Sequence, residues 1–245
     1  KGRRTFKWSS LLVLTAMRAA RRFVSEIWSV QRACTGKFLR RVLRLLMGCN
    51  QSALILDGSL GHGCVALLAL SGPQKGDLVV ADSGEPPRSH LERIATLLPS
   101  ETSRAELSAI VVGVGPGSYT GIRAASAAAA GIAAALNLPI IEIASDRALC
   151  AAAHEVGGET VVLPLGTREV LVIRASGSEI AAHADAPASA DLARVASRLP
   201  HAFAHLASNA LSEALTSAAR GVTPRRGEIT LRYPSPPRGV DGRGV

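Results

Sequence analysis

Short apolar runs alternate with polar and glycine-rich stretches from Ser52 onward, and each run predicts a buried element. Several runs are too short for helices and are bounded by Gly, Asp or Pro, which is typical of strands. The run at 107–115 is uncharged and rich in β-branched residues, which favours a central strand. The strands predicted in this half are 53–57, 64–70, 77–83, 107–115 and 139–144.

Between these strands the apolar residues recur at helical spacing. An alanine-rich helix has Ser118 or Thr120 as its N-cap and Asn137 as a stop signal. The helix that follows the last of these strands has Ser145 as its expected N-cap. The helices predicted in this half are 87–99, 118–137 and 145–156.

Three antiparallel strands followed by helix, strand, helix and strand form half of an actin-like, ribonuclease-H-like domain. The chain is therefore expected to have an α/β fold of the actin-like (ASKHA) type, with mixed sheets flanked by helices in two similar lobes. The first lobe is expected at 51–150, and a less regular second lobe at 151–245. The second lobe is predicted to have strands at 160–166, 169–176 and 179–185, a helix at 189–199 and an irregular tail after Pro224.

Residues 1–50 form a basic segment unlike the rest of the chain. They hold twelve Lys or Arg and one acid, a net charge of +11, whereas 51–245 carries −2 and the whole chain +9. The segment is typical of a transit peptide, an RNA-binding arm or an amphipathic membrane-surface helix. The alternative is that the segment is an unstructured extension or results from a misplaced translation start, since Met47 lies just before the first predicted strand. The near-neutral remainder offers no obvious phosphate-binding surface.

The four cysteines fit neither a zinc site nor a disulfide framework, which is typical of a reduced cytoplasmic protein. The longest apolar candidate, Trp8–Met17, is about half of what a membrane span requires.

The glycine loop between the strand at 107–115 and the alanine helix matches neither phosphate-binding template. Gly115, Gly117 and Gly121 are spaced GxGxxxG, and Gly121 is followed by Ile122 and Arg123 rather than by the lysine of a P-loop. Backbone N–H groups at a helix N-terminus leave weak anion binding open. The alternative is a rigid turn that lets the helix and the strand approach closely.

Small side chains cover nearly every face of the alanine helix. Such a helix lets a partner backbone approach closely, as in tight helix–helix contacts, or it packs into a crowded core. Both uses fit together if one face meets the sheet and the other meets a partner.

The block "VVGVGPGSYTGIR" at 111–123 resembles the GPGSFTGLR signature of the TsaB (YeaZ) proteins. Residues 87–99 are similar to that family's RxHSExLLP helix, with His90 in place, and "LILDGS" is similar to its IDTS strand, with Gly58 replacing Thr. "EITLRYP" at 228–234 is similar to its terminal segment. The residues of the family-motif loop are Asp57, Ser59, Gly115, Pro116, Gly117, Ser118, Thr120, Gly121 and Arg123.

The resemblance implies a non-catalytic subunit that binds and activates a TsaD-like catalytic subunit in threonylcarbamoyl modification of the tRNA adenosine next to the anticodon. It implies tRNA contact only indirectly, a TsaE-like ATPase as a further partner, and ATP or Mg²⁺ at most through the partner complex. Without the partner, the same helix face would also allow a homodimer. The expected interface residues are His90, Leu91, Ile94, Ala125, Ala129, Ile132 and Ala133.

The alternative is an actin-like ATP- or metal-dependent enzyme, either a threonylcarbamoyl transferase or a glycoprotease-type metallopeptidase. TsaD proteins carry a paired-histidine motif after the strand that follows the glycine helix, and the matching stretch here, 141–149, has no histidine. We therefore expect no catalytic residue and no metal ligand in this chain. One HxxxH does occur at His201 and His205, where a shared helix face would suit a metal, but surface histidines are commoner.

Overall fold

The computed structural model describes residues 50–61, 63–82, 89–219 and 229–233. All of the basic segment 1–50 except Asn50 lies outside these residues, as does most of the tail after Pro224. The helices within the described ranges are too short or too polar to cross a membrane.

A five-stranded mixed sheet forms the first half, in the order β3-β2-β1-β4-β5. β1 pairs antiparallel with β2 and parallel with β4, and β4 pairs parallel with β5. This arrangement confirms the predicted mixed α/β fold, and each of the five predicted strands is present. Their bounds are β1 (Ser52–Asp57), β2 (Cys64–Ala69), β3 (Leu78–Val80), β4 (Leu107–Gly113) and β5 (Ile140–Ile143).

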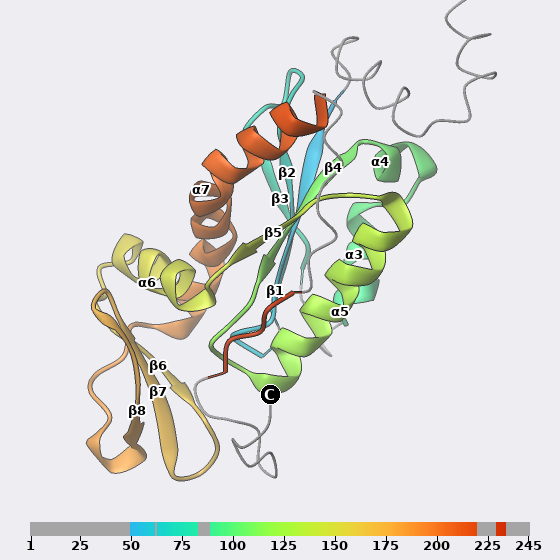
Figure 1. Cartoon of the computed structure of the whole chain (residues 1–245). Coiled ribbons are helices and arrows are strands. Elements are labelled where there is room, and N and C mark those ends of the chain that lie inside the picture. The colour runs from blue at the N-terminus through green and yellow to red at the C-terminus, as the bar shows by residue number, and fades with distance from the viewer. Residues whose placement is uncertain (1–49, 62, 83–88, 220–228, 234–245) are drawn as a thin grey trace, which may run out of the picture. The chain divides into compact units, whose positions relative to one another are not determined.

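Helices cover both faces of this sheet (Figure 1). α3 and α5 lie on one face, and α6 lies with α7, the last helix, on the other. Of the two predicted N-caps of the alanine helix, Ser118 and Thr120, Ser118 occupies the position, and its side chain accepts a hydrogen bond from the Gly121 amide at 3.3 Å. Asn137, in the left-handed region at φ 53°, ends that helix. The bounds are α3 (His90–Leu97), α4 (Glu101–Ala105), α5 (Tyr119–Leu136) and α6 (Ser145–Glu155).

The second half contains a three-stranded antiparallel sheet in the order β6-β7-β8. Within the described residues all strands of this second sheet pair antiparallel. The first sheet differs because β4 and β5 are added to it by parallel pairing. A short 3₁₀ helix, η1 (His183–Asp185), follows β8. The strands are β6 (Val161–Pro164), β7 (Glu169–Arg174) and β8 (Gly177–Ala182).

α7 (Leu192–Ala219) is much longer than the helix predicted at 189–199 and continues through Pro200. Proline removes one backbone hydrogen bond from a helix, so the sequence favours an end at this position. The apolar stripe nevertheless continues beyond it, and Phe203, Ala207 and Leu211 are buried. α7 packs on β2, β4 and β5 of the first sheet, and this burial offsets the cost of the proline.

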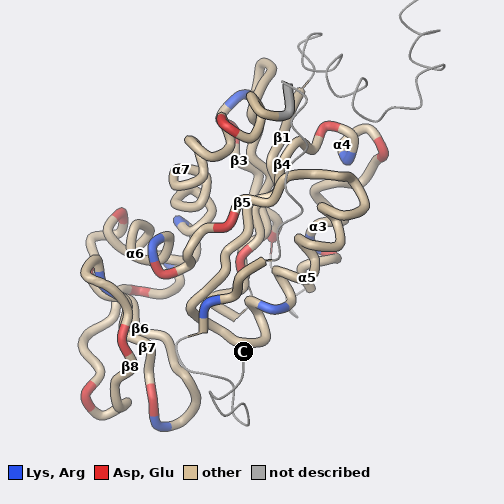
Figure 2. Tube along the Cα trace, in the orientation of Figure 1, with Lys and Arg blue, Asp and Glu red and all other residues tan. Residues whose placement is uncertain are grey.

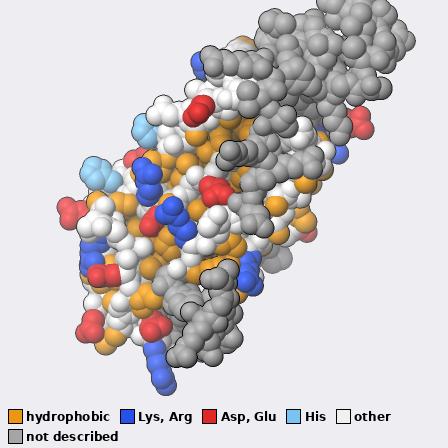
Figure 3. All heavy atoms as spheres, viewed as in Figure 1, with side chains coloured by type: hydrophobic (Ala, Val, Ile, Leu, Met, Phe, Trp, Pro, Cys, Tyr) orange, Lys and Arg blue, Asp and Glu red, His pale blue; other side chains and the backbone are white. Residues whose placement is uncertain are grey.

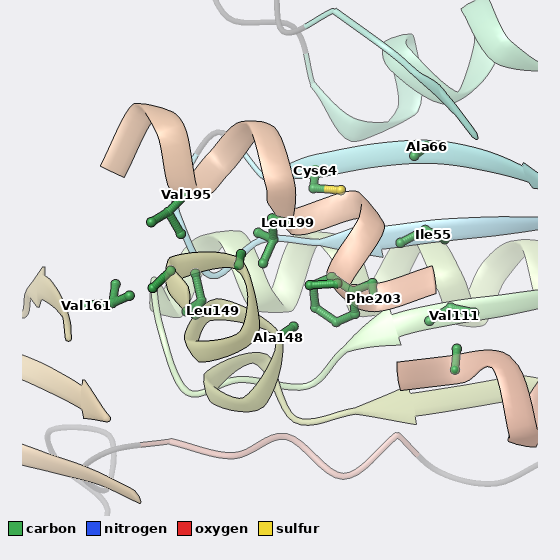
Figure 4. Close-up of a cluster of buried hydrophobic side chains, with 14 of the residues drawn as sticks. Ile55, Cys64, Ala66, Val111, Ala148, Leu149, Val161, Val195, Leu199 and Phe203 are labelled. Carbon is green, nitrogen blue, oxygen red and sulfur yellow. The ribbon is translucent and has the colours of Figure 1, made fainter. Parts of the chain in front are cut away.

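Alternate residues of the central strands point into two hydrophobic clusters. Ile55 and Val111 join Phe203, Leu199 and Leu149 in the cluster on the α6 and α7 side (Figure 4). Leu54, Leu56 and Ile110 are among the residues of the cluster under α3 and α5. Because both faces of β1 and β4 are covered, both strands are apolar along almost their whole length.

Charged residues of both signs are scattered along the described chain (Figure 2). The face in Figure 3 likewise mixes hydrophobic, basic and acidic side chains. The described residues on this face form no broad field of one sign, in keeping with the near-neutral composition of 51–245.

Candidate functional site

The glycine loop connects β4 to α5 and packs against the turn that follows β1. The Ser118 amide donates to the Ser59 carbonyl at 2.8 Å, and the Gly115 amide donates to the Ser145 hydroxyl at 3.0 Å. The Gly115–Pro116 peptide is cis. These two backbone donors of the loop are therefore committed to neighbouring segments of the chain.

Two of the loop glycines are required by the close approach of other backbone segments. Gly115 has φ +91°, and a Cβ there would meet the carbonyl oxygen of Arg232. A Cβ on Gly121 would meet the carbonyl oxygen of Gly58. Both contacts are with backbone, which has little room to move away. The geometry therefore favours the rigid-turn interpretation of the loop over the phosphate-binding one.

Asp57, at the end of β1, is enclosed by donors. The Ser59 hydroxyl and amide donate to Asp57 Oδ2 at 2.5 and 2.9 Å, and the Ser145 hydroxyl donates to Oδ1 at 2.7 Å. The carboxyl group has no solvent exposure, and burial raises its pKa although the Ser59 and Ser145 hydrogen bonds lower it. Asp57 thus joins the turn after β1 to the start of α6.

Ser145 was predicted to be the N-cap of α6, and this prediction is wrong. Ala144 occupies the cap position and makes no side-chain hydrogen bond there. The Ser145 side chain is fully buried and instead bridges Asp57 and the Gly115 amide. A serine before a helix is normally read as a cap because its hydroxyl satisfies the first N–H groups. Here a buried carboxylate, distant in sequence, competes successfully for the same hydroxyl.

A groove of about 780 Å³ runs between the start of α3 and one face of α5. Leu91 is 63% exposed beside it, and α5 contributes small side chains to its floor. Ser89 caps α3 at one end of the groove through a capping box with Glu92. The lining residues from α5 and its cap are Ser118, Thr120, Gly121, Ala124, Ala127, Ala128, Gly131 and Ile132.

Three of the seven expected interface residues, His90, Leu91 and Ile132, line this groove. His90 Nε2 also donates to the carbonyl oxygen of Asp57 at 3.3 Å, which ties the groove to the loop.

The other four expected interface residues are buried in the hydrophobic core of this chain and are not exposed on its surface. These residues are Ile94, Ala125, Ala129 and Ala133. Ala125 and Ala129 have no exposed area because this stripe of α5 packs on the sheet. Alanine also occupies the stripe of α5 that faces the groove, so composition alone does not distinguish the buried stripe from the open one. The stripe open to the groove consists of Ala124, Ala127, Ala128 and Gly131.

Two further motif residues, Thr120 and Arg123, point to different sides of α5. Thr120 lines the groove, whereas Arg123 points to the flank of α5 and donates to the Tyr233 hydroxyl at 3.0 Å. The sequence gives no local signal for this pair, which is 110 residues apart.

His201 and His205 lie one turn apart on α7, and both are exposed. Their shared exposed face agrees with the surface interpretation of this motif. Among the described residues, no three His, Cys, Asp or Glu side chains are grouped as metal ligands.

Sequence comparison finds a matching family model and relatives of partial length. The model for TsaD, tRNA N6-adenosine threonylcarbamoyltransferase, matches residues 87–201. An uncharacterized protein of Mycobacterium tuberculosis is 36% identical over 100 residues, 39% of this chain and 44% of that protein. The tRNA threonylcarbamoyladenosine biosynthesis protein TsaB of Escherichia coli is 34% identical over 82 residues, 31% of this chain and 36% of that protein. The chain thus spans less than half the length of the curated relatives it matches.

Among solved structures, YeaZ from Pseudomonas aeruginosa aligns with a TM-score of 0.45 and 24% identity. The alignment covers 75% of this chain and 99% of that one.

Proposed function

We propose that the chain is a TsaB (YeaZ)-type protein, a non-catalytic subunit that binds and activates a TsaD-type transferase. In this proposal the complex places a threonylcarbamoyl group on the tRNA adenosine next to the anticodon. The transferase contacts the tRNA, a TsaE-like ATPase is a further partner, and ATP and Mg²⁺ enter through the complex. The proposed location is the cytoplasm.

The groove between α3 and α5 is the observation that carries this proposal. Its α5 side is built from Ala124, Ala127, Ala128 and Gly131, which let another helix approach closely. Leu91 stands 63% exposed at its edge, where an apolar partner would cover it. A helix of the transferase packed along this groove would bury apolar surface on both chains.

The surroundings of Asp57 support the non-catalytic half of the proposal. An acidic residue that positions Mg²⁺ and nucleotide must present carboxylate oxygens to the ligand. Asp57 has both oxygens engaged by Ser59 and Ser145 and has no solvent exposure. This carboxyl group therefore serves the fold, and binding a nucleotide through it would require those hydrogen bonds to break.

The alternative, an enzyme of the transferase type, is favoured by the family model that matches residues 87–201. Titration of the isolated chain with Mg-ATP in a calorimeter separates the two functions. The partner-subunit proposal expects no heat of binding and no ATP turnover. Micromolar binding with turnover would overturn it in favour of the enzyme.

Binding to a TsaD-type transferase is tested by substitution within the groove. Ala127 is exposed and lines the groove, so Ala127→Arg fills it with a long charged side chain. We expect this variant to fold as the wild type does and to lose co-purification with the transferase. Ala130 is also exposed on α5 but lies outside the groove lining, which makes Ala130→Arg the matched control.

Retention of binding by the Ala127→Arg variant would place the interface elsewhere. Equal loss in both variants would mean that charge on α5, and not occupancy of the groove, disrupts binding. Ala129→Arg is unsuitable for this test because Ala129 is buried against the sheet.

A further inference from the structure

Residues Ile229–Tyr233 return to the first sheet and run along α5 and β5 (Figure 1). Ile229 packs against the cluster under α3 and α5. The Thr230 amide donates to Glu142 Oε1 at 3.2 Å, and the Arg232 amide donates to the Val114 carbonyl at 2.7 Å. The segment is therefore bonded to the chain just before the glycine loop as well as to β5.

The end of this segment contacts the first turn of α5. The Tyr233 hydroxyl accepts from Arg123 Nε at 3.0 Å, and the Tyr233 ring lies 5.1 Å from the Tyr119 ring between centroids. The Arg123 guanidinium lies over both rings, 4.1 Å from the centroid of Tyr119 and 5.9 Å from that of Tyr233. Tyr119, Arg123 and Tyr233 thus form one cluster that joins the C-terminal segment to the helix.

We propose that residues 229–233 are a latch that holds the first turn of α5 in place and thereby controls the α3–α5 groove. The same helical turn supplies Tyr119 and Arg123 to the latch on one side, and Thr120 and Gly121 to the groove on the other. A change in the latch therefore reaches the groove through a single turn of helix.

The surface position of the cluster suits a reversible contact. Tyr119 is 41% exposed and Arg123 is exposed, so the cluster opens without breaking the hydrophobic core. Exposed cation–π contacts and single hydrogen bonds each contribute little compared with a buried hydrophobic cluster. Regions held by a few such contacts open locally far more often than a core does.

Amide hydrogen exchange of the full chain tests the latch without any partner. In Tyr233→Ala we expect exchange of the amides of Thr120–Ala125 to rise about tenfold, while amides of Ala202–Leu211 in α7 keep their wild-type rates. Tyr233→Phe keeps the ring but removes the hydroxyl acceptor, and a smaller rise in the same residues is expected. Arg123→Gln, which alters the helix side of the contact, should give the pattern of Tyr233→Ala.

Unchanged exchange at Thr120–Ala125 in both Tyr233→Ala and Arg123→Gln would overturn the latch. An equal rise in α7 would also overturn it, because the segment would then stabilise the whole fold without local control. The chain has two tyrosines, Tyr119 and Tyr233, so fluorotyrosine labelling gives two ¹⁹F resonances that report on this contact. The Tyr119 resonance should shift in Arg123→Gln, and its constancy would count against the latch.

The claim that the latch controls partner docking rests on the proposed function, and it is tested separately by measuring the affinity for the transferase. We expect the affinity of Tyr233→Ala for the TsaD-type transferase to fall about tenfold, since a disordered first turn must be ordered again on binding. Equal affinities of the wild type and this variant would overturn partner control. A wild-type chain that does not bind the transferase would overturn the proposed function, whereas the latch itself is decided by hydrogen exchange.

Discussion

The Ser145 hydroxyl donates to Asp57 Oδ1 at 2.7 Å although the two residues are 88 positions apart in the chain. Ser145 also accepts from the Gly115 amide at 3.0 Å, so one hydroxyl joins the end of β1, the glycine loop and the start of α6. All three groups are buried, where an unmade hydrogen bond is costly. This bridge fixes the direction in which the chain enters and leaves the glycine loop.

Removal of the bridging hydroxyl should destabilise the fold. Ser145→Ala leaves the Gly115 amide without its acceptor and Asp57 Oδ1 without its donor. We therefore expect the free energy of unfolding, measured in urea, to fall by about 1–3 kcal/mol. Ser126→Ala is the matched control, because the buried Ser126 hydroxyl has no hydrogen-bond partner among the described residues. The control should stay within about 0.5 kcal/mol of the wild type. Equal losses of unfolding free energy in both variants would mean that the hydrogen bonds of Ser145 add no stability beyond that of a buried serine.

The ionisation of Asp57 should reduce stability as the pH rises. Burial raises the pKa of this carboxyl in the folded chain above its ordinary value of 3.8. The folded state then retains the proton to higher pH than the unfolded state does. The stabilisation from the protonated form is thus complete below pH 3.8 and is lost as the pH rises through the raised pKa.

Asp57→Asn mimics the protonated acid at every pH, so the difference between wild type and variant isolates this group. We expect the free energy of unfolding of the wild type to fall relative to the variant as the pH rises above 3.8 and through the raised pKa of Asp57. A wild type that gains on the variant as the pH rises would show that the hydrogen bonds from Ser59 and Ser145 outweigh the cost of burial.

Much of the first sheet was predictable because its signals are local. The strand at Leu107–Gly113 is apolar throughout, and the helix after it has a serine cap and an asparagine stop. The length of α7 was not predictable in the same way, since Pro200 is a local break signal and the burial of Phe203 that outweighs it depends on distant strands. Local pattern therefore fails where tertiary packing opposes it.

The candidate site was only partly predictable for the same reason. The motif loop and His90 were found from the sequence, but which alanines of α5 face outward depends on where the sheet lies. Ala125 and Ala127 are the same residue type two positions apart, yet one is buried and the other exposed. The contact of Tyr233 with Arg123 joins residues 110 positions apart, and no local pattern predicts it.

The two halves of the described chain should unfold together. Phe203 on α7 lies in one cluster with Ile55 of the first sheet and Leu171 of the second. Phe203→Ala should lower the free energy of unfolding by about 3–5 kcal/mol, with one transition for both sheets in hydrogen exchange. Ile180→Ala, at a 38% exposed position on β8, is the control with a small effect. Separate transitions for the two sheets would instead favour independent lobes at 51–150 and 151–245.

Two glycines of α5 should respond in opposite directions to the same substitution. A Cβ on Gly121 meets the Gly58 carbonyl, which is backbone, so Gly121→Ala forces the helix away from the turn after β1. We expect a loss of about 1–3 kcal/mol from this overpacking. A Cβ on Gly131 meets nothing within 4 Å, so Gly131→Ala should gain about 0.5–1 kcal/mol from helix propensity. Thermal unfolding of both variants provides the comparison. A neutral Gly121→Ala would show that the loop has room beside α5, and would reopen the interpretation of this loop as an anion site.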